Sequence, residues 1–461
     1  MAKSLRSFLE EVKKKAPQNL VIIKKEVDPK FELTGVLRKM QEKGMYPVTY
    51  FEKVKGTDFP VVVNIQANRD SIALALETTP EKLSIEYGNR QDNLIDPVLV
   101  DEADAPVKQK KMIGDEVDLS KFPNITHCEL DGGPYISSGL SIMKNPETGI
   151  SNMGIYRHQI KSPKKLGIDI GEYAHGAHIV RAAEAKNRPQ ECAIVVGHHP
   201  LLVLASQYRG PMDVSELRVA GGLLGEPLRV VKCETIDLEV PADAEIVIEG
   251  EIPPGVREHE GPFGEYTWYM GGSGPSRVFN IKAITYRNDA IYQDLFSAHP
   301  EHNLTGLVGR EAMVFKKVKA SIPTVKAVSL PFSGTCRHAV YVSIRKEFDG
   351  LGRNAGLAAL AADPFMKLVI VVDEDIDIYN EAEVMWAVAT RTQPARDVII
   401  IPEAYVCELD PSAYSIKGRH TRGYMNDKWI IDATKPFGLP FQERAEVPDE
   451  VWKNINLDDY M

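Results

Sequence analysis

Two glutamates bracket a short glycine- and proline-containing loop in the run Glu260-Gly-Pro-Phe-Gly-Glu265. Glycine and proline favour irregular backbone, so neither a helix nor a strand sets the direction of the two acids. Two carboxyl groups held close together repel each other, and with burial this can keep one of them protonated near neutral pH. The pair is a candidate for general acid–base chemistry, although a surface turn with two solvated acids is the open alternative.

A second candidate cluster lies in the run Ser151-Asn-Met-Gly-Ile-Tyr-Arg157. Asn152 offers an amide oxygen, and Arg157 offers a planar fork that can bind an anion. Their odd separation sends the two side chains to opposite faces of a regular strand, and a bulge at Gly154 could bring them together. An exposed strand with one polar and one basic residue is the alternative.

Three further polar residues have the chemistry of metal ligands. His175 and His178 are three residues apart, which places both on one face of a helix, and Glu216 begins a helix or turn. Nitrogen and oxygen ligands of this kind favour Mn²⁺ or Mg²⁺ with phosphate oxygens over a structural zinc. A helical histidine pair without a third ligand is more often structural, so both readings stay open.

Composition narrows the class of protein. The 461 residues are 43% hydrophobic and 26% charged, with a net charge of -10, which is typical of a soluble globular protein and argues against nucleic-acid or anionic-membrane partners. Five scattered cysteines without a C-x-x-C pair indicate a reducing compartment. The amphipathic start differs from a signal peptide, and the apolar run 192–206 is interrupted by histidines and proline. We expect a cytoplasmic protein without a membrane span.

The elements that must position these residues fall into three zones, which predict domains at 1–112, 113–318 and 319–461. The first zone mixes helices, such as 31–43, with short strands and indicates a small α/β unit. The second holds many short strands and turns, including hairpins at 136–160 and 277–296, and favours an antiparallel barrel or sandwich. The third alternates apolar strands with helices, which is typical of a covered parallel sheet. The fold class is therefore mixed α/β with several domains.

Taken in chain order, these motifs resemble the UbiD family of decarboxylases, which use prenylated flavin mononucleotide (FMN). The resemblance covers essentially the whole chain and rests on six pieces. They are Asn152-Met-Gly-Ile-Tyr-Arg157, Ala-His175-Gly, Glu216 before Ala-Gly-Gly, Glu260-Gly-Pro-Phe-Gly-Glu265, Asp373-Glu-Asp-Ile-Asp with Met-Trp386-Ala, and Lys428-Trp-Ile-Ile-Asp-Ala-Thr434.

The resemblance implies a fold and a set of site residues. The fold is an N-terminal α/β domain, a central split β-barrel of the flavin-reductase type, and a C-terminal α/β domain with an oligomerisation tail. The implied Mn²⁺ ligands, which clamp the cofactor phosphate with K⁺ nearby, are Asn152, His175 and Glu216. The implied cofactor-binding residues also include Ile155, Tyr156, Arg157 and Lys428, and the implied catalytic residues are Arg157, Glu260 and Glu265.

The chemistry suits these residue types. Removing CO₂ from an sp² carbon leaves an electron pair that needs a sink, and in the family the prenylated flavin supplies that sink. Arg157 can hold the departing carboxylate and separate the pKa values of Glu260 and Glu265. We expect Glu265 to donate the proton that replaces CO₂, with Glu260 as its partner, although such coupled acids titrate jointly.

The substrate is less well specified. His302 and Arg310 are two cationic candidates that resemble a pair in family members acting on furan-2,5-dicarboxylate, where the pair binds the carboxylate that stays. A structural ion pair and a helix cap are the alternative. We expect furan-2,5-dicarboxylate to be converted reversibly to 2-furoate. Pyrrole-2-carboxylate, indole-3-carboxylate and phenolic acids such as 4-hydroxybenzoate remain open.

The resemblance also implies partners. A flavin prenyltransferase would supply the cofactor, and the chain would assemble as a homodimer or homohexamer. A different class stays in view, because some family members act only inside larger complexes, where this chain would be a flavin-binding subunit.

Overall fold

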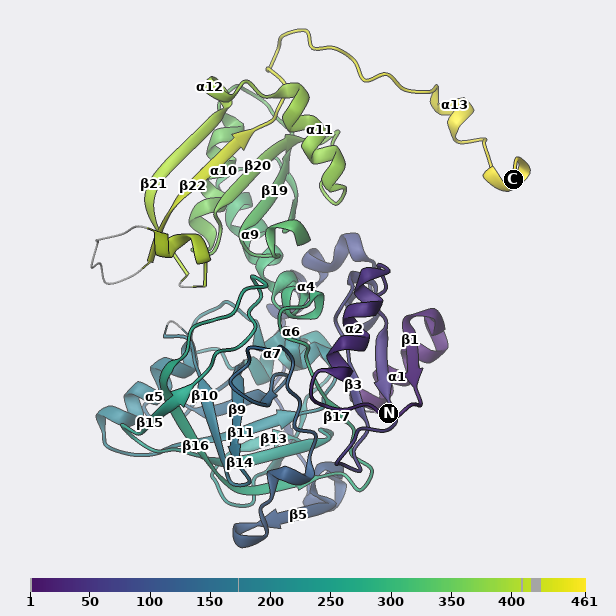
Figure 1. The fold of residues 1–461 in the computed structure, drawn as a ribbon. Helices are drawn as coiled ribbons and strands as arrows, with labels where there is room; N and C mark the ends of the chain where they lie inside the picture. The colour runs from purple at the N-terminus through teal and green to yellow at the C-terminus, as the bar shows by residue number, and fades with distance from the viewer. Residues whose placement is uncertain (1, 173, 408, 416–423) are drawn as a thin grey trace.

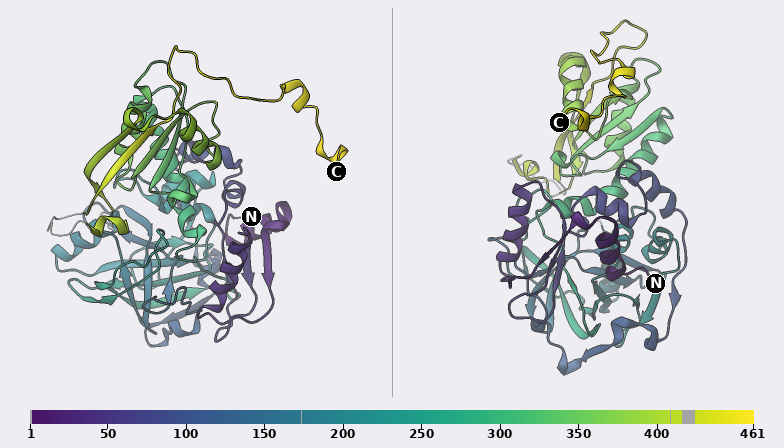
Figure 2. Two further views of the ribbon diagram at one scale, coloured as in Figure 1. Left: turned by 45° about the horizontal axis from the view of Figure 1, so that its top comes forward. Right: turned by 90° about the vertical axis from the view of Figure 1, so that its right-hand side faces the viewer.

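The computed structural model describes residues 2–172, 174–407, 409–415 and 424–461. The chain folds into a mixed α/β structure with several sheets, which confirms the predicted fold class at that level. An N-terminal part packs beside a large central sheet, and a C-terminal part lies above both (Figures 1 and 2). The described residues contain no helix long and apolar enough to cross a bilayer. The predicted domain boundaries stay a prediction.

The N-terminal part is built on a four-stranded sheet with the order β1-β2-β3-β17. Its strands are β1 (Leu20–Ile23), β2 (Val48–Phe51), β3 (Val61–Val63) and β17 (Tyr292–Gln293). Its helices are α1 (Leu5–Lys15), α2 (Glu32–Glu42), α3 (Arg69–Ala75) and α4 (Leu83–Gln91). The first two confirm the helices expected from the sequence. Helix α1 begins there because the Ser4 side chain caps it, and it buries Leu5, Phe8 and Val12.

The central sheet holds ten antiparallel strands. They are β5 (Lys110–Ile113), β6 (Tyr135–Ile136), β7 (Leu140–Lys144), β8 (Ser151–Ile155), β9 (Arg157–Ser162), β10 (Lys165–Asp169), β11 (Gln190–Val196), β14 (Ile246–Ile252), β15 (Arg257–Glu260) and β16 (Gly274–Tyr286). The main order is β6-β9-β10-β16-β14-β11-β7-β8, and β5 and β15 also pair with β16. A separate three-stranded sheet has the order β13-β12-β4. Its strands are β4 (Val98–Leu99), β12 (Arg229–Lys232) and β13 (Glu239–Pro241).

This sheet curls on itself. Strands β8 and β9 lie near opposite ends of the pairing order, yet Tyr156 alone separates them in the chain. The two ends must therefore meet, and we call the place where β8 passes into β9 the seam. Between the described strands no backbone ladder joins β8 to β6 or β9 across it. The predicted split β-barrel is thus not confirmed, because the hydrogen-bonded sheet is curled but open.

Five further helices lie between the central strands in the chain or follow them. They are α5 (His175–Ala185), α6 (Pro200–Ser206), α7 (Glu216–Leu224), α8 (Pro300–Thr305) and α9 (Leu307–Ser321). The glutamate expected to begin a helix does so, because Ser215 caps α7 in front of it. Helices α5, α6 and α7 all contact β8, so the seam is also where helices meet the sheet.

The second predicted hairpin is wrong. Strand β16 ends at Tyr286, but the chain after the turn does not return along it. Instead β17 pairs in parallel with β3 and completes the N-terminal sheet. The alternation of residue types predicted a strand correctly, but a register with a strand more than 200 positions earlier carries no local signal.

The C-terminal part is a five-stranded sheet with the order β18-β19-β20-β22-β21. Its strands are β18 (Val325–Ser329), β19 (Ala339–Ile344), β20 (Leu368–Asp373), β21 (Val398–Val406) and β22 (Tyr424–Asp432), and its helices are α10 (Leu351–Ala362), α11 (Glu381–Arg391) and α12 (Pro394–Asp397). Strands β19, β20 and β22 are parallel, as expected from their apolar runs. Beyond them the chain continues as an extended arm with α13 (Asp449–Trp452), which projects away from the body (Figure 1).

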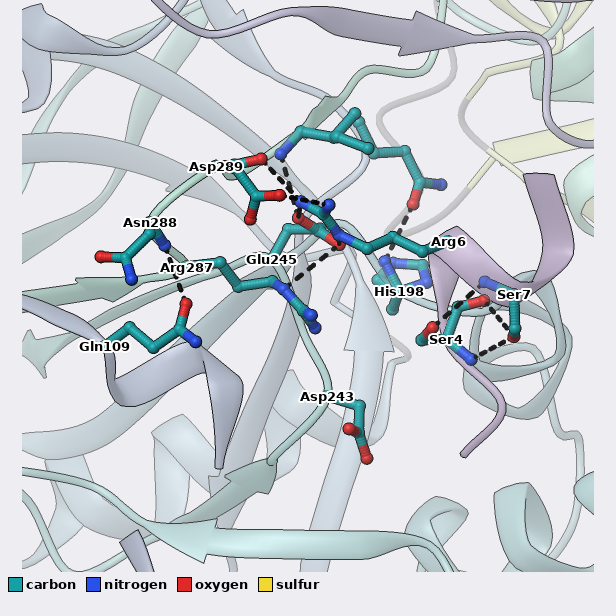
Figure 3. A network of polar contacts seen from close by, with 12 residues as sticks. Ser4, Arg6, Ser7, Gln109, His198, Asp243, Glu245, Arg287, Asn288 and Asp289 are labelled. Atoms are coloured by element: carbon teal, nitrogen blue, oxygen red, sulfur yellow. Dashed lines mark hydrogen bonds and ion pairs between the residues drawn. The ribbon is translucent and has the colours of Figure 1, made fainter. Parts of the chain in front are cut away.

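A buried ion pair ties the first helix to the central sheet (Figure 3). Arg6 donates from Nε and Nη2 to the two oxygens of Glu245, each at 2.9 Å, and from Nη1 to Asp289 at 2.7 Å. The Glu245 side chain is fully buried and also accepts from the Ile291 amide at 3.0 Å. Burying a carboxylate is costly unless it is paired, so this contact stabilises the junction only while both partners are present.

We predict that Arg6→Ala lowers the free energy of unfolding by about 2 kcal/mol, because it removes charged hydrogen bonds from a buried carboxylate. Thermal unfolding followed by circular dichroism measures this as a lower Tm. Lys15→Ala is the matched control, since it removes an exposed pair with Glu11 from the same helix. Equal changes in Tm for the two variants would contradict the assignment.

Candidate active site

Two adjoining cavities open at the seam. The first has a volume of about 380 Å³ and is lined in part by Asn152, His175 and Glu216. The second has a volume of about 260 Å³ and is lined in part by Arg157 and Glu265. They share five lining residues, namely Ile155, Tyr156, Gly171, Gln207 and Arg209. Five residues singled out in the sequence therefore line one continuous site, namely Asn152, Arg157, His175, Glu216 and Glu265.

A break between two strands, and not a bulge, brings Asn152 and Arg157 to this site. The ladder between β7 and β8 runs in regular register through Gly154, so the bulge that Gly154 could have hosted is absent. Strand β8 ends at Ile155, Tyr156 lies outside both strands, and β9 begins at Arg157. Changing partner strands at Tyr156 removes the alternation that would have sent the two side chains to opposite faces.

Arg157 is the centre of the second cavity. It donates to Glu260 twice, from Nε at 3.1 Å and from Nη2 at 2.7 Å, and to Glu265 from Nη1 at 2.5 Å. Nη2 also lies 3.1 Å from Asp169 Oδ2. One guanidinium thus contacts three carboxyl groups. A guanidinium has five N–H donors, so its three hydrogen bonds to Glu260 and Glu265 leave N–H groups for another anion.

Local backbone geometry explains why the four groups can approach so closely. Asp169 lies directly opposite Arg157 in the ladder between β9 and β10. A Cβ atom at Gly271 would come within 2.9 Å of the Glu265 side chain and 3.3 Å of Arg157, so only glycine leaves room there. The Gly264 amide donates to Asp131 Oδ1 at 3.1 Å, which fixes the loop next to Glu265.

Glu265 and Arg157 have pKa values shifted by their surroundings. Burial raises the pKa of Glu265 to about 7; the Arg157 charge opposes this rise and the Asp169 charge adds to it. Burial disfavours the Arg157 cation, but Asp169, Glu265 and Glu260 outweigh it and raise the pKa of Arg157 above its ordinary value. Glu265 is therefore an acid that exchanges a proton near neutral pH beside a permanent cation, as a general acid requires.

The first cavity gathers the expected metal ligands. Asn152 Nδ2 donates to Glu216 Oε1 at 2.9 Å, and His175 Nδ1 lies 3.7 Å from the same oxygen. Asn152 Oδ1 is buried and has no hydrogen-bond partner. A buried amide oxygen without a partner is costly, and a cation beside it would satisfy the oxygen. The donor set of one amide oxygen, one imidazole nitrogen and one carboxylate fits a hard divalent ion.

Three expected residues line neither cavity, and the first is Glu260, which is linked to the second cavity through Arg157. His178 is exposed and lines neither cavity, so the structure separates it from His175. Lys428 on β22 also lines neither cavity, and its Nζ donates to the Pro364 carbonyl at 3.0 Å. Phe365, the next residue after Pro364, does line the second cavity. Lys428 is thus close to the site without reaching it.

His302 and Arg310 both line the second cavity. His302 is not the cation expected from the sequence, because burial and the Arg337 charge lower its pKa to about 3. A buried neutral imidazole can still donate or accept a hydrogen bond. Arg310 forms an ion pair with Asp363, so the alternative of a structural pair is correct for that contact, while the guanidinium still faces the cavity.

Sequence reasoning missed two more arginines in the second cavity. Arg209 has its pKa lowered to about 10, first by Arg310 and then by burial, and Arg337 has its pKa lowered to about 10, first by burial and then by Arg310. Arg337 lies over the Tyr266 ring, with 4.2 Å between the guanidinium carbon and the ring centre. Of the three arginines Arg209, Arg310 and Arg337, Arg310 forms an ion pair with Asp363. This end of the cavity therefore has excess positive charge and suits an anion.

Family models match most of the chain. The N-terminal, Rift-related and C-terminal domains of 3-octaprenyl-4-hydroxybenzoate carboxy-lyase (UbiD) match residues 13–90, 98–300 and 303–433. An anhydromevalonate phosphate decarboxylase of Methanothermobacter thermautotrophicus is 33% identical over 89% of this chain and 93% of its own. A phenolic acid decarboxylase of Sedimentibacter hydroxybenzoicus is 32% identical over 94% of this chain and 92% of its own.

Solved structures resemble the whole chain. The UbiD-class enzyme HmfF from Pelotomaculum thermopropionicum in complex with FMN has a TM-score of 0.93 and 40% identity, and the match covers 99% of this chain and 100% of that one. An evolved dimeric form of the same enzyme in complex with prenylated FMN has a TM-score of 0.90 and 38% identity, and the match covers 100% of both chains.

We predict a pH signature of Glu265 in thermal stability. Folding raises the pKa of Glu265 from 4.5 to about 7, so the folded chain binds this proton more tightly than the unfolded chain. Stability from this group is fully present below about pH 4.5 and is lost as the pH rises to about 7. The Tm of the wild type relative to that of Glu265→Gln should fall over this range and then level off. A constant difference from pH 4 to pH 8, measured by calorimetry, would contradict the shifted pKa.

Proposed function

The chain belongs to the UbiD family of carboxy-lyases, and on that premise we propose that it removes CO₂ reversibly from a heteroaromatic acid with prenylated FMN. The observation that carries the proposal is the contact of Arg157 with Glu260 and Glu265 at the wall of a cavity. This arrangement supplies an anion-binding N–H and a proton donor at one place.

The two cavities support a bound flavin. Together they run from the Asn152 end to the Glu265 end of the seam, and Ile155 and Tyr156 line both. We propose that these two residues contact the cofactor and that Lys428 approaches it from β22. Prenylated FMN, when bound, supplies the electron sink for the bond that breaks. The binding of FMN and prenylated FMN by solved relatives supports the same assignment.

The first cavity supports a divalent metal site. We propose that Asn152, His175 and Glu216 hold Mn²⁺, with K⁺ nearby, and that the metal fastens the cofactor phosphate. The unpartnered Asn152 Oδ1 supports this proposal, because a bound metal ion would satisfy this buried amide oxygen. The Glu216 carboxylate, which accepts from Asn152 Nδ2, would be the second oxygen ligand.

Arg157, Glu265 and Glu260 then have separate roles in the reaction. A free N–H of Arg157 binds the substrate carboxylate that leaves as CO₂. Glu265 gives its proton to the ring carbon from which CO₂ has departed, so the C–C bond is replaced by a C–H bond. The resulting Glu265 carboxylate stays beside Arg157 at 2.5 Å and regains a proton from solvent. Glu260 keeps the guanidinium in place through two hydrogen bonds. High bicarbonate reverses the sequence.

The positive end of the second cavity supports a dicarboxylate substrate. Arg209, Arg310 and Arg337 line it with neutral His302, while the acid cluster occupies the other end. We propose that the carboxylate that is retained binds to the arginines and that the reacting carboxylate faces Arg157. Furan-2,5-dicarboxylate, giving 2-furoate, has its carboxylates on opposite sides of a flat ring and suits this polarity.

A second substrate class has its own support. The phenolic acid decarboxylase of Sedimentibacter hydroxybenzoicus is about as similar to this chain as the anhydromevalonate phosphate decarboxylase is. A phenol hydroxyl could accept a hydrogen bond from the same arginines, so a 4-hydroxybenzoate type of acid is the alternative substrate. Pyrrole-2-carboxylate and indole-3-carboxylate have no second group for the arginines.

We further propose the cellular setting that the family implies. A flavin prenyltransferase supplies the cofactor in the cytoplasm, and the chain forms a homodimer or homohexamer. The projecting C-terminal arm supports self-assembly, because large apolar side chains on it are exposed, including Trp452 at 66% and Leu457 at 64%. We also propose that the curled central sheet acts as a split barrel around the cofactor.

We predict that Glu265→Gln lowers the rate of CO₂ release at least about 100-fold while the absorption spectrum of the bound flavin stays largely intact, because the variant removes the proton and little else. The measurement is turnover of the protein co-expressed with a flavin prenyltransferase. Glu258→Gln is the matched control, since Glu258 lies on β15 but pairs with Lys165 at 2.7 Å instead of Arg157. A Glu265→Gln enzyme with near-normal turnover would remove Glu265 from the role.

We predict that Arg337→Gln lowers kcat/KM for furan-2,5-dicarboxylate at least about tenfold more than kcat/KM for pyrrole-2-carboxylate, because only the dicarboxylate has a retained carboxylate for this cation to bind. CO₂ release from furan, pyrrole, indole and phenolic acids measures this. Inert furan-2,5-dicarboxylate together with turnover of a monocarboxylate would contradict the dicarboxylate assignment.

A further inference from the structure

Asp169 is the third carboxylate on Arg157, and the acid–base roles above leave it without a function. It ends β10 directly opposite Arg157 in the ladder with β9, and its Oδ2 lies 3.1 Å from Arg157 Nη2. Cross-strand neighbours of opposite charge hold each other in place. Asp169 also lines the second cavity, so it shares the space in which the reaction is proposed to occur.

Counting charges shows that the cluster needs a proton. One guanidinium beside three ionised carboxyl groups has a net charge of about -2, and such an excess is costly in a partly buried site. Protonating one carboxyl group halves the excess. The three groups therefore compete for one proton, and their surroundings decide which of them holds it.

Geometry distinguishes the three acids. Glu260 is 2% exposed at the side chain and accepts two hydrogen bonds from Arg157, so its charge is well compensated. Burial raises the pKa of Asp169 and the Arg157 charge opposes this rise, but the Asp169 side chain is 41% exposed, so water also solvates its charge. Glu265 is 10% exposed and has a single contact with Arg157. Glu265 is the acid whose charge is least compensated.

We propose that Asp169 is a positioning residue for the proton of Glu265, because its charge occupies Arg157 and thereby leaves Glu265 as the acid that stays protonated. The inference rests on the proposed role of Glu265 as the proton donor. Asp169 acts through Arg157 and through its own charge, and it transfers no proton to the substrate. After each proton transfer, Arg157 pairs with the newly ionised Glu265 and keeps its contact with Asp169.

The other charged groups around Glu265 agree with this assignment. Those that face it are Arg157 from β9, Asp169 from β10, Glu260 from β15, Arg337 from the segment before β19, and neutral His302 from α8. Burial raises the pKa of Glu265, the Asp169 charge raises it further, and Arg157 and Arg337 lower it. Removing the Asp169 charge should therefore lower the pKa of Glu265.

The test is the protonation midpoint of Glu265 in the full-length chain. Infrared spectra of protein with ¹³C-labelled glutamate show the C=O stretch of a protonated carboxyl group, and Glu265→Gln identifies the band. Asp169→Asn should move its midpoint down by about one pH unit, the usual effect of a neighbouring charge. Asp169→Glu should restore the midpoint. Glu258→Gln should leave it in place, since this variant removes an equal charge from the pair of Glu258 with Lys165.

The same variants test the role during turnover. Catalysis that needs a protonated Glu265 falls as the pH rises, so Asp169→Asn should shift the alkaline limb of the kcat profile to lower pH by a similar amount. An unchanged or raised midpoint in a folded Asp169→Asn protein would overturn the inference. If the midpoint shifts but no acid releases CO₂, the proposed function fails and the inference about the Glu265 proton stands.

Discussion

The contact of a single guanidinium, Arg157, with three carboxyl groups organises the site, and it exists because a curled sheet brings its two ends together. Strand β8 is at one end of the pairing order and β9 is next to the other end, and only Tyr156 separates them in the chain. Asn152 on β8 and Arg157 on β9 therefore lie along the same seam. Backbone closure by hydrogen bonds at this place would remove the gap into which the two cavities open.

The charges around this seam are separated by sign. Acids surround Arg157 at one end of the second cavity, and Arg209, Arg310 and Arg337 share the other end with one paired aspartate. An acid substrate is drawn to the positive end, while its reacting carbon lies near the proton donor. Burial is the main reason that His302 is neutral, and the Arg337 charge adds to it, because a further positive charge there would be repelled.

Much of this could be predicted from the sequence, because local patterns carry it. The first two helices and the apolar parallel strands follow from residue types and spacing, and the order of the motifs identified the family. Long-range pairing did not follow: β17 joins β3, and the ladder places Asp169 opposite Arg157. Side-chain burial could not be predicted either: His302 is neutral because it is buried, and His178 is exposed and lines neither cavity. Arg209 and Arg337 stand in loops without any spacing signal, whereas a hairpin drawn from 157 to 169 could have found Asp169.

The position of one proton tests the account most directly. Neutron diffraction from deuterated crystals grown about one pH unit below the Glu265 pKa of about 7 would locate it. The account predicts a deuteron on Glu265, a fully deuterated Arg157, and no deuteron on Glu260 or Asp169. A deuteron on Asp169 or Glu260 with an ionised Glu265 would contradict it, because the group next to the substrate would then have no proton to give.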